Sequence, residues 1–308
     1  MRHRFHPWLL LLALIVVCSA VIGLVALLRY RGTADQAGLL SRLPTENAFV
    51  LYLDFDALRK AGMLNLLDRS KVPEEPEYKS FVAESGFDYR EDLDSALVSF
   101  RPDGVFMLLR GRFNWKALSG YVQAQGGTCL NAFCRTIGST PDRHISFFPL
   151  RPGVMGLAVS KDDWAATNLT VKRPKLDTAA IPKQPVWLWV PSGRLADVDN
   201  LPAGTRQFAK AMQGAEKIVL SVGPRGDGYE AVLDVTTRSV PDASTLVSHL
   251  EGITSFLKKM IAEEKRSPNP QDLSGVLTAG VFERQDRRVV GRWPLERAFL
   301  EALASGSL

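Results

Sequence analysis

Apolar runs separated by polar turns predict a β-rich chain with a few helices. The runs AFVLYL (48–53) and PVWLWV (185–190) have the β-branched and aromatic character of strands and lie 137 residues apart. VSFRPDG (98–104) and LSVGPRG (220–226) each place a Pro/Gly turn beside apolar runs, as in a β-hairpin. The recurrence of these patterns predicts an internal duplication.

A third match supports the duplication. It aligns three residues of one strand pair with three of another: Phe147, Val154 and Gly156 with Phe282, Val289 and Gly291. Helical spacing of apolar residues falls between the strands. It predicts helices over 57–67 with Asp56 as its cap, over 114–125, and over 242–263 with Asp242 as its cap.

Each repeat therefore has the pattern β-α-β-β-α-β-β. We expect an α+β fold with an N-terminal transmembrane helix followed by two tandem units, each an antiparallel sheet covered by helices. The expected boundaries are a membrane anchor at 1–31, a juxtamembrane linker at 32–43, a first unit at 44–167, a linker at 168–184 and a second unit at 185–308.

The anchor is expected because Trp8 to Leu28 contains no charged residue. At about 1.5 Å per residue, a helix of this length spans the hydrocarbon core of a bilayer. Trp8 and Tyr30 lie at its two edges, and Arg29 and Arg31 follow it, so these four residues are the expected membrane-interface contacts.

Two alternatives for the N-terminus stay open. A cleaved signal peptide has a shorter apolar region that ends in a small-x-small site. A lipoprotein signal needs a small residue before its cysteine, whereas Val17 precedes Cys18. The longer apolar run and its arginine-flanked end favour a retained anchor.

The net charge of +5 does not indicate nucleic-acid binding. Residues 1–31 hold four arginines and no acid, so residues 32–308 carry 34 basic and 33 acidic groups. The excess positive charge therefore flanks the apolar run and can face anionic lipid. A nearly neutral remainder offers no broad field for phosphates. The local cluster Arg284, Arg287, Arg288 and Arg292 is interrupted by acids.

Cys129 and Cys134 lie close together after Gly126 and Gly127. A disulfide between them is expected in an oxidising compartment, and two unrelated small residues are the alternative. This pair and the N-terminal flank favour a single-pass protein of the inner membrane with a cytoplasmic N-terminus and an extracytoplasmic domain. Two thiolates without a second pair do not favour a metal site.

Catalytic patterns are missing from the sequence. It holds no GxSxG, HExxH or Walker-type motif, and we expect no catalytic residue, no cofactor and no metal. His144 and His249 are each interpreted as ordinary edge or helix residues. Asp54 and Asp56 form a D-x-D pair, but Asp56 is explained more simply as a helix cap.

Trp187 and Trp189 lie on one face of their strand, because side chains alternate with a period of two. Apolar residues on the other face indicate a central strand. The two tryptophans are also the candidate apolar binding face.

The segments LPTENAFVLYLDFDALRKAGML (43–64) and LLRGRFN (108–114), together with the anchor, resemble a loose group of uncharacterised bacterial single-pass envelope proteins with a DUF3352-like region. The resemblance covers the first unit and implies no activity or catalytic residue.

We therefore expect a membrane-anchored, extracytoplasmic binding or scaffolding module without catalytic activity. Its partners would be the lipid bilayer and a protein of the envelope. A membrane-tethered carrier of a lipid or other apolar ligand is the alternative, and an enzyme with an unrecognised site is the third. A large closed cavity would favour the carrier, and an exposed apolar patch would favour the binding module.

Overall fold

The computed structural model describes residues 36–64, 76–138, 140–173, 181–191, 203–226 and 228–305. By its internal contacts the chain divides into a small unit (Met1–Arg42 with Lys172–Ile181) and a large one (Leu43–Val171 with Pro182–Leu308). In the small unit, residues 36–40 are helical. There the Arg173 N–H donates to the Ser41 carbonyl at 2.6 Å.

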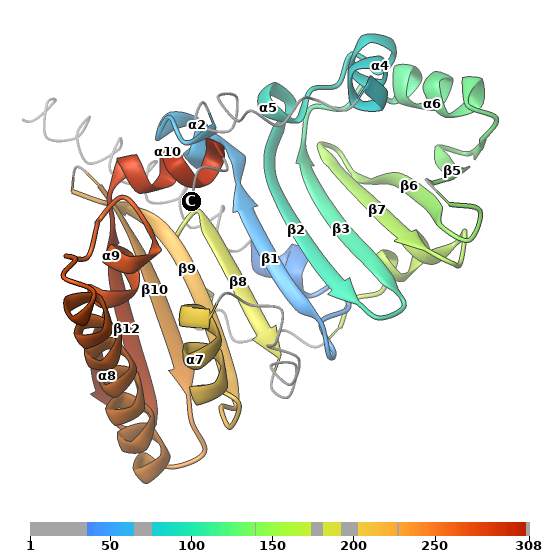
Figure 1. Cartoon of the computed structure of the whole chain (residues 1–308). Helices are drawn as coiled ribbons and strands as arrows, with labels where there is room; N and C mark the ends of the chain where they lie inside the picture. The colour runs from blue at the N-terminus through green and yellow to red at the C-terminus, as the bar shows by residue number, and fades with distance from the viewer. Residues whose placement is uncertain are drawn as a thin grey trace, which may run out of the picture. The chain divides into compact units, whose positions relative to one another are not determined.

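The large unit begins with seven strands and their helices (Figure 1). In chain order these elements are β1 (Phe49–Asp54), α2 (Phe55–Lys60), α4 (Pro76–Ser85), α5 (Tyr89–Asp92), β2 (Leu93–Arg101), β3 (Gly104–Gly111), α6 (Trp115–Ala124), β4 (Thr128–Leu130), β5 (Phe133–Ile137), β6 (His144–Arg151), β7 (Val154–Ser160) and the 3₁₀ helix η1 (Ala165–Thr170).

Five strands and four helices follow in the second half of the described chain. They are β8 (Val186–Pro191), α7 (Ala203–Ala211), β9 (Lys217–Arg225), β10 (Gly228–Thr236), α8 (Val240–Glu263), α9 (Leu273–Thr278), β11 (Val281–Gln285), β12 (Arg288–Leu295) and α10 (Arg297–Ser305).

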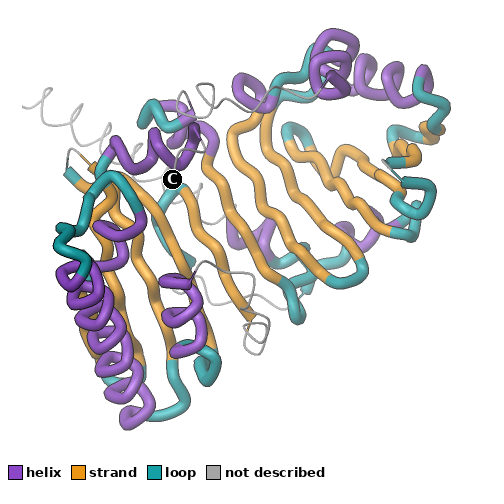
Figure 2. The backbone as a smooth tube through the Cα atoms, in the orientation of Figure 1, coloured by secondary structure: helices purple, strands orange, loops and turns teal. Residues whose placement is uncertain are grey.

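The twelve strands of the described residues form one antiparallel sheet, in the order β11-β12-β10-β9-β8-β1-β2-β3-β7-β6-β5-β4 (Figure 2). The expectation of two separate sheets is therefore wrong. The two halves repeat one strand order, β1-β2-β3-β7-β6 and β8-β9-β10-β12-β11, but β1 pairs with β8 and joins them. This pairing satisfies backbone groups that two separate sheets would leave at exposed edges.

The expected N-terminal membrane helix is not part of this fold as described. Trp8 to Leu28 and the interface residues Arg29, Tyr30 and Arg31 lie outside the described residues. Within the described ranges, no helix is both long and apolar enough to cross a bilayer.

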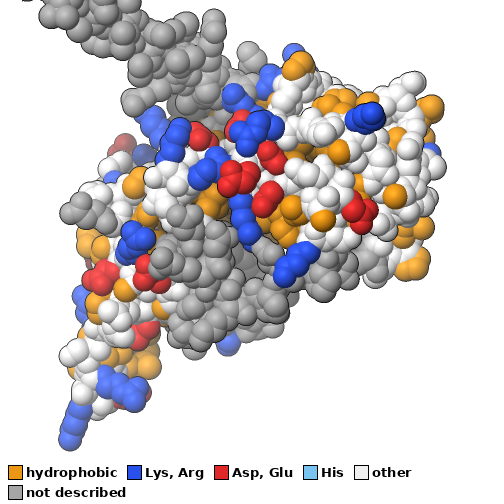
Figure 3. All heavy atoms as spheres, turned by 90° about the horizontal axis from the view of Figure 1, so that it is seen from above, with side chains coloured by type: hydrophobic (Ala, Val, Ile, Leu, Met, Phe, Trp, Pro, Cys, Tyr) orange, Lys and Arg blue, Asp and Glu red, His pale blue; other side chains and the backbone are white. Residues whose placement is uncertain are grey.

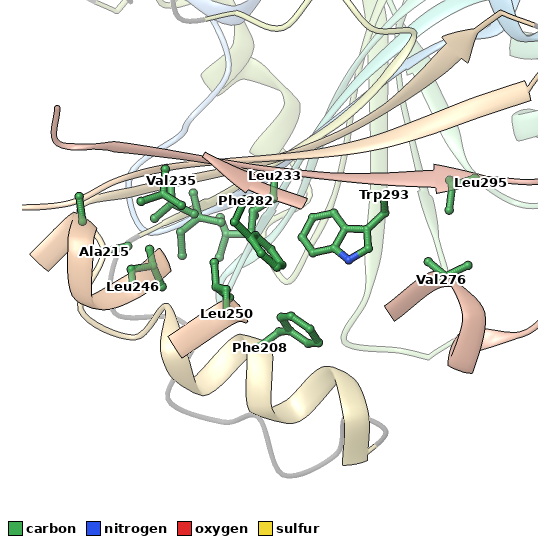
Figure 4. Packing of buried hydrophobic residues seen from close by; sticks show 14 of the residues in the cluster. Phe208, Ala215, Leu233, Val235, Leu246, Leu250, Val276, Phe282, Trp293 and Leu295 are labelled. Carbon is green, nitrogen blue, oxygen red and sulfur yellow. The ribbon is translucent and has the colours of Figure 1, made fainter. Parts of the chain in front are cut away.

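Helices cover one face of the sheet in both halves. In the second half, α7, α8 and α9 lie in front of the strands (Figure 1). Phe208 of α7 contacts Phe282 and Trp293 of the sheet, with ring centroids 6.3 and 6.1 Å away (Figure 4). Leu246 and Leu250 of α8 complete this core. In the first half, Leu118 and Val122 of α6 pack on the same face.

The helix caps differ from the expected ones by a few residues. The carboxylate of Asp54, not Asp56, accepts the Ala57 N–H at 2.9 Å and starts α2. Ser239, not Asp242, caps α8 through the Asp242 N–H at 3.2 Å. The observed caps lie two and three residues ahead of the expected ones, in extended backbone that suits the N-cap position.

Candidate functional site

The helix-bearing face has an uncovered apolar area in the middle of the sheet. No described helix lies in front of the lower parts of β1, β2, β3 and β7 (Figure 1). Phe100 of β2 is 41% exposed there, and Leu220 of β9 is 38% exposed. Central strands of a sheet usually have apolar side chains covered, so two large exposed ones on inner strands need an explanation.

Strand register connects these two residues through a continuous set of apolar side chains. Directly paired residues of neighbouring strands point to the same face. Leu220 pairs with Leu188, which pairs with Leu51. Phe49 pairs with Phe100. The same rows continue over β3, β7 and β6.

We name this surface the apolar strip. Its members are the apolar residues of these two rows that are not fully buried: Phe49, Leu51, Phe100, Val105, Met107, Ile145, Leu157, Val159, Leu188 and Leu220. Phe100 and Leu220 are exposed, and the other eight are half-buried. Each of them lies on a strand, so the sheet positions the strip rigidly. None has a side-chain hydrogen-bond donor, and the one acceptor is the weak thioether of Met107, so the strip binds mainly by apolar contact.

No family model matches the chain, and no curated protein matches it. Three solved structures of TP0453, in crystal forms III, I and IV, resemble it. Forms III and I each give a TM-score of 0.48, at 10% and 11% identity, and cover 87% of this chain and 97% of theirs. Form IV gives 0.43 at 9% identity and covers 86% and 96%. At these TM-scores the likeness carries no argument about function.

Trp187 and Trp189, the residues singled out from the sequence, lie on the opposite face of β8 from the strip. Trp187 is 1% exposed and stacks on Tyr52 with 5.5 Å between ring centroids. Trp189 is half-buried, with the Lys217 ammonium 5.2 Å from its ring centroid. Burial and the Asp54 carboxylate raise the pKa of Tyr52, so its hydroxyl stays neutral. The buried ring of Trp187 therefore offers no accessible binding surface.

Sequence reasoning missed the strip because its members are separated along the chain by up to 171 positions, from Phe49 to Leu220. The sequence offered one signal for the strip: Leu51 and Leu188 lie at equivalent positions of the repeated strand segments 48–53 and 185–190. Their exposure follows from where helices are placed, which a strand pattern does not encode.

Cys129 and Cys134 pair directly across β4 and β5, and a disulfide joins them. Asn131 and Ala132, both with positive φ, form the two-residue turn of this hairpin. The Ser119 hydroxyl of α6 lies 3.7 Å from the Cys134 Sγ. The disulfide therefore links the two strands of the edge hairpin, and Cys134 packs against α6.

Three of the four arginines in the cluster of the second half are paired with acids. Arg288 forms a two-pronged pair with Asp234, which raises the pKa of the guanidinium. Arg292 lies 3.3 Å from Glu230, and Arg287 lies 3.8 Å from Glu216. Seen from above, side chains of both signs lie intermixed (Figure 3). Neither the paired arginines nor the face seen in Figure 3 presents a single-sign field to a nucleic acid.

A hollow of about 840 Å³ lies between the β9–β10 turn and the start of α10. Its two cations are both paired, Arg225 with Glu230 and Arg297 with Glu301. It is open and shallow, and we do not place the candidate site there. Across the described ranges, no three His, Cys, Asp or Glu side chains form a group suited to a metal. His144 and His249 lie on different elements, β6 and α8.

Proposed function

We propose that the protein is a non-catalytic binding module of an oxidising, extracytoplasmic compartment, and that its apolar strip contacts the bound partner. The observation that carries this proposal is the exposure of Phe100 and Leu220 on inner strands of the sheet. Leaving large apolar side chains in water costs free energy, roughly 25 cal/mol per Å² of apolar surface. A chain keeps such a surface when a partner covers it.

The compartment is supported by the disulfide. A bond between Cys129 and Cys134 persists where thiols are oxidised, as in the periplasm or outside the cell. The expected orientation, with the N-terminus in the cytoplasm, is part of the same proposal and follows from the sequence.

Site-specific photo-crosslinking tests the binding role. Benzoylphenylalanine replaces Phe100 in one variant of the full chain and Leu220 in another, and cells are irradiated intact. Ile137 is the control position, because it is 63% exposed and lies on β5 outside the strip. Mass spectrometry should find adducts at both strip positions and none at Ile137. No adducts at the strip, or equal labelling at all three positions, would refute the proposal.

A thiol-labelling experiment tests the compartment. In a Cys18→Ser background, a membrane-impermeant maleimide is added to intact cells with and without prior reduction. Labelling of Cys129 and Cys134 only after reduction supports an extracytoplasmic, oxidised hairpin. Labelling that needs lysis and no reductant places the domain in the cytoplasm and overturns this part.

A further inference from the structure

We infer that Cys129 is a site of thiol modification: a thiolate opens the Cys129–Cys134 disulfide by attack on the Cys129 Sγ, and Cys134 is the sulfur that leaves. The modifying group is a small thiol or the dithiol of an oxidoreductase. This inference goes beyond the proposed function and does not rest on the apolar strip. It follows from the place of the two sulfurs in the sheet, from their burial and from what lies behind each of them.

The disulfide crosses the last two strands at one end of the sheet. Among the described residues β4 is the end strand, and β5 lies between it and β6. Cys129 of β4 pairs with Cys134 of β5, which in turn pairs with Phe147 of β6. The S–S bond therefore leads inward from the edge of the sheet, and Phe147 follows in the same row.

The direction of the bond decides which sulfur a thiolate can attack. A thiolate approaches a disulfide sulfur in line with the S–S bond, from the side opposite the leaving sulfur. For Cys129 that side is the sheet edge, because no described strand lies beyond β4. For Cys134 it is the side of Phe147, which is 7% exposed and fills the next position of the row. The strand order leaves a path to Cys129 and closes the path to Cys134.

Burial has the same asymmetry. Cys134 is 0% exposed and belongs to the core cluster that α6 forms with β6 and β7. Cys129 is half-buried, and its neighbours in β4, Thr128 and Leu130, are exposed. Sulfur reactivity follows access, so thiols reach the sulfur at the edge first.

The products of the attack also suit the two positions. The entering group stays bonded to Cys129, where it can extend from the edge into solvent. An adduct on Cys134 would have to displace packed core side chains. The released Cys134 sulfur needs no added space, and the Ser119 hydroxyl, 3.7 Å from it, can donate a hydrogen bond to the thiolate.

The chemical step is a thiol–disulfide exchange. The thiolate forms a bond to the Cys129 Sγ while the S–S bond breaks. The electron pair of that bond leaves on the Cys134 Sγ, which takes a proton from water. A second thiol then attacks the mixed disulfide, so that two thiols are oxidised and the protein disulfide is reduced to two thiols. Oxidation of the reduced hairpin by a disulfide reagent follows the same steps in reverse.

Peptide mapping of the full chain, in a Cys18→Ser background, tests the inference. The folded protein is exposed briefly to reduced glutathione, and free thiols are then trapped with excess N-ethylmaleimide in urea. Chymotrypsin cleaves after leucine and phenylalanine, so it separates the two cysteines at Leu130 or Phe133. Mass spectrometry should find glutathione on Cys129 and maleimide on Cys134, in about tenfold or greater excess over the opposite pattern.

The same reaction in concentrated urea is the reference, because unfolding removes the difference between the two sulfurs. Glutathione should then be found on both cysteines in comparable amounts. An equal distribution in the folded protein, or an excess on Cys134, overturns the inference. A folded protein that forms no mixed disulfide, while the unfolded chain does, overturns it as well.

Two matched variants test the block behind Cys134. Phe147→Ala removes the ring from that side and should raise the share of glutathione on Cys134. Phe282→Ala is the control, because the internal repeat matches Phe282 to Phe147 and it is 8% exposed. It should keep the wild-type ratio. Thermal unfolding confirms that each variant is folded at the assay temperature. An unchanged ratio in folded Phe147→Ala overturns the role of Phe147, and the map of the parent chain decides the site of attack by itself.

Discussion

Leu51 of β1 and Leu188 of β8 are direct register partners, and they are also equivalent positions of the internal repeat. In the repeat, Val50 is equivalent to Trp187 and Tyr52 to Trp189. Val50 pairs with Trp189 and Tyr52 pairs with Trp187, so the pairing is symmetric about Leu51 and Leu188. A pseudo-twofold axis perpendicular to the sheet therefore passes between Leu51 and Leu188. Rotation about an axis perpendicular to the sheet maps each face of the sheet onto itself. This explains why the helices of both halves lie on the same face.

The axis also explains how the two halves share their cores. Phe49 of β1 packs against the core of the second half, whereas Val186 of β8 packs against a core cluster of the first. One side chain from the first strand of each half therefore packs in the core of the other half. The two halves are arranged like the subunits of a symmetric dimer, and the apolar strip crosses the pseudo-twofold axis.

A cavity in one half should therefore weaken the other half. Leu250 of α8 is 0% exposed, and Leu250→Ala should cost about 2–5 kcal/mol of unfolding free energy. Because β1 and β8 join the halves, amide hydrogen exchange should accelerate in β3 and β7 as well as in β10 and β12. The matched control is Leu303→Ala, at a residue that is 56% exposed. Faster exchange in β10 alone would mean that the halves unfold independently.

The disulfide should stabilise the chain modestly, because it closes a short loop. The loop-entropy relation gives about 2 kcal/mol for a closure of this size. Urea unfolding with and without reductant should show this loss in the wild type. Reductant should leave Cys129→Ser/Cys134→Ser unchanged, and that variant should match the reduced wild type. A reductant effect on the double variant would assign the change to something other than this bond.

The strands of the fold were predictable from the sequence, whereas their assembly into one sheet was not. Alternation and Pro/Gly turns identified β1, β8 and the two central hairpins, because these signals are local. Whether β1 pairs with β8 depends on an interaction across 137 positions that no local pattern carries. Phe147 and Phe282 do hold equivalent register positions, facing Leu157 and Gly291. Leu157, not Gly156, is therefore the register equivalent of Gly291, so the match predicted from the sequence is off by one residue.

The candidate site could not be found from sequence for a related reason. Trp187 attracted attention as a large aromatic residue, but tryptophan is often well buried, and here it stacks on Tyr52. Phe100 looked like an ordinary strand residue. Its exposure depends on which strands the helices cover, and helix placement is a property of the tertiary structure.

Two helical glycines should respond to alanine in opposite directions. A Cβ at Gly252 of α8 would meet nothing within 4 Å, so Gly252→Ala should stabilise the chain by about 0.5–1 kcal/mol through better helix propensity. A Cβ at Gly275 of α9 would lie 2.1 Å from the Asn269 carbonyl oxygen. Gly275→Ala should therefore cost about 1–3 kcal/mol. Chemical denaturation of both variants measures the difference, and equal signs would contradict this account.

Asp272 should give the start of α9 a stability that depends on pH. Its carboxylate accepts the Ser274 N–H at 2.7 Å and also the Ser274 hydroxyl at 2.5 Å. The hydroxyl bond is the main cause that lowers the pKa of Asp272 below its ordinary value of 3.8. A carboxyl group with a lowered folded pKa stabilises the folded chain fully above its unfolded pKa, and it loses that contribution as the pH falls through the folded pKa.

Asp272→Asn isolates this contribution, because asparagine caps a helix about as well but does not titrate. Urea unfolding of wild type and variant is compared from about pH 7 down to about pH 2. The free-energy difference should be constant above about pH 5 and should shrink in acid, since the other carboxylates titrate alike in both proteins. A difference that stays constant to the lowest pH would mean that the charge of Asp272 does not stabilise α9.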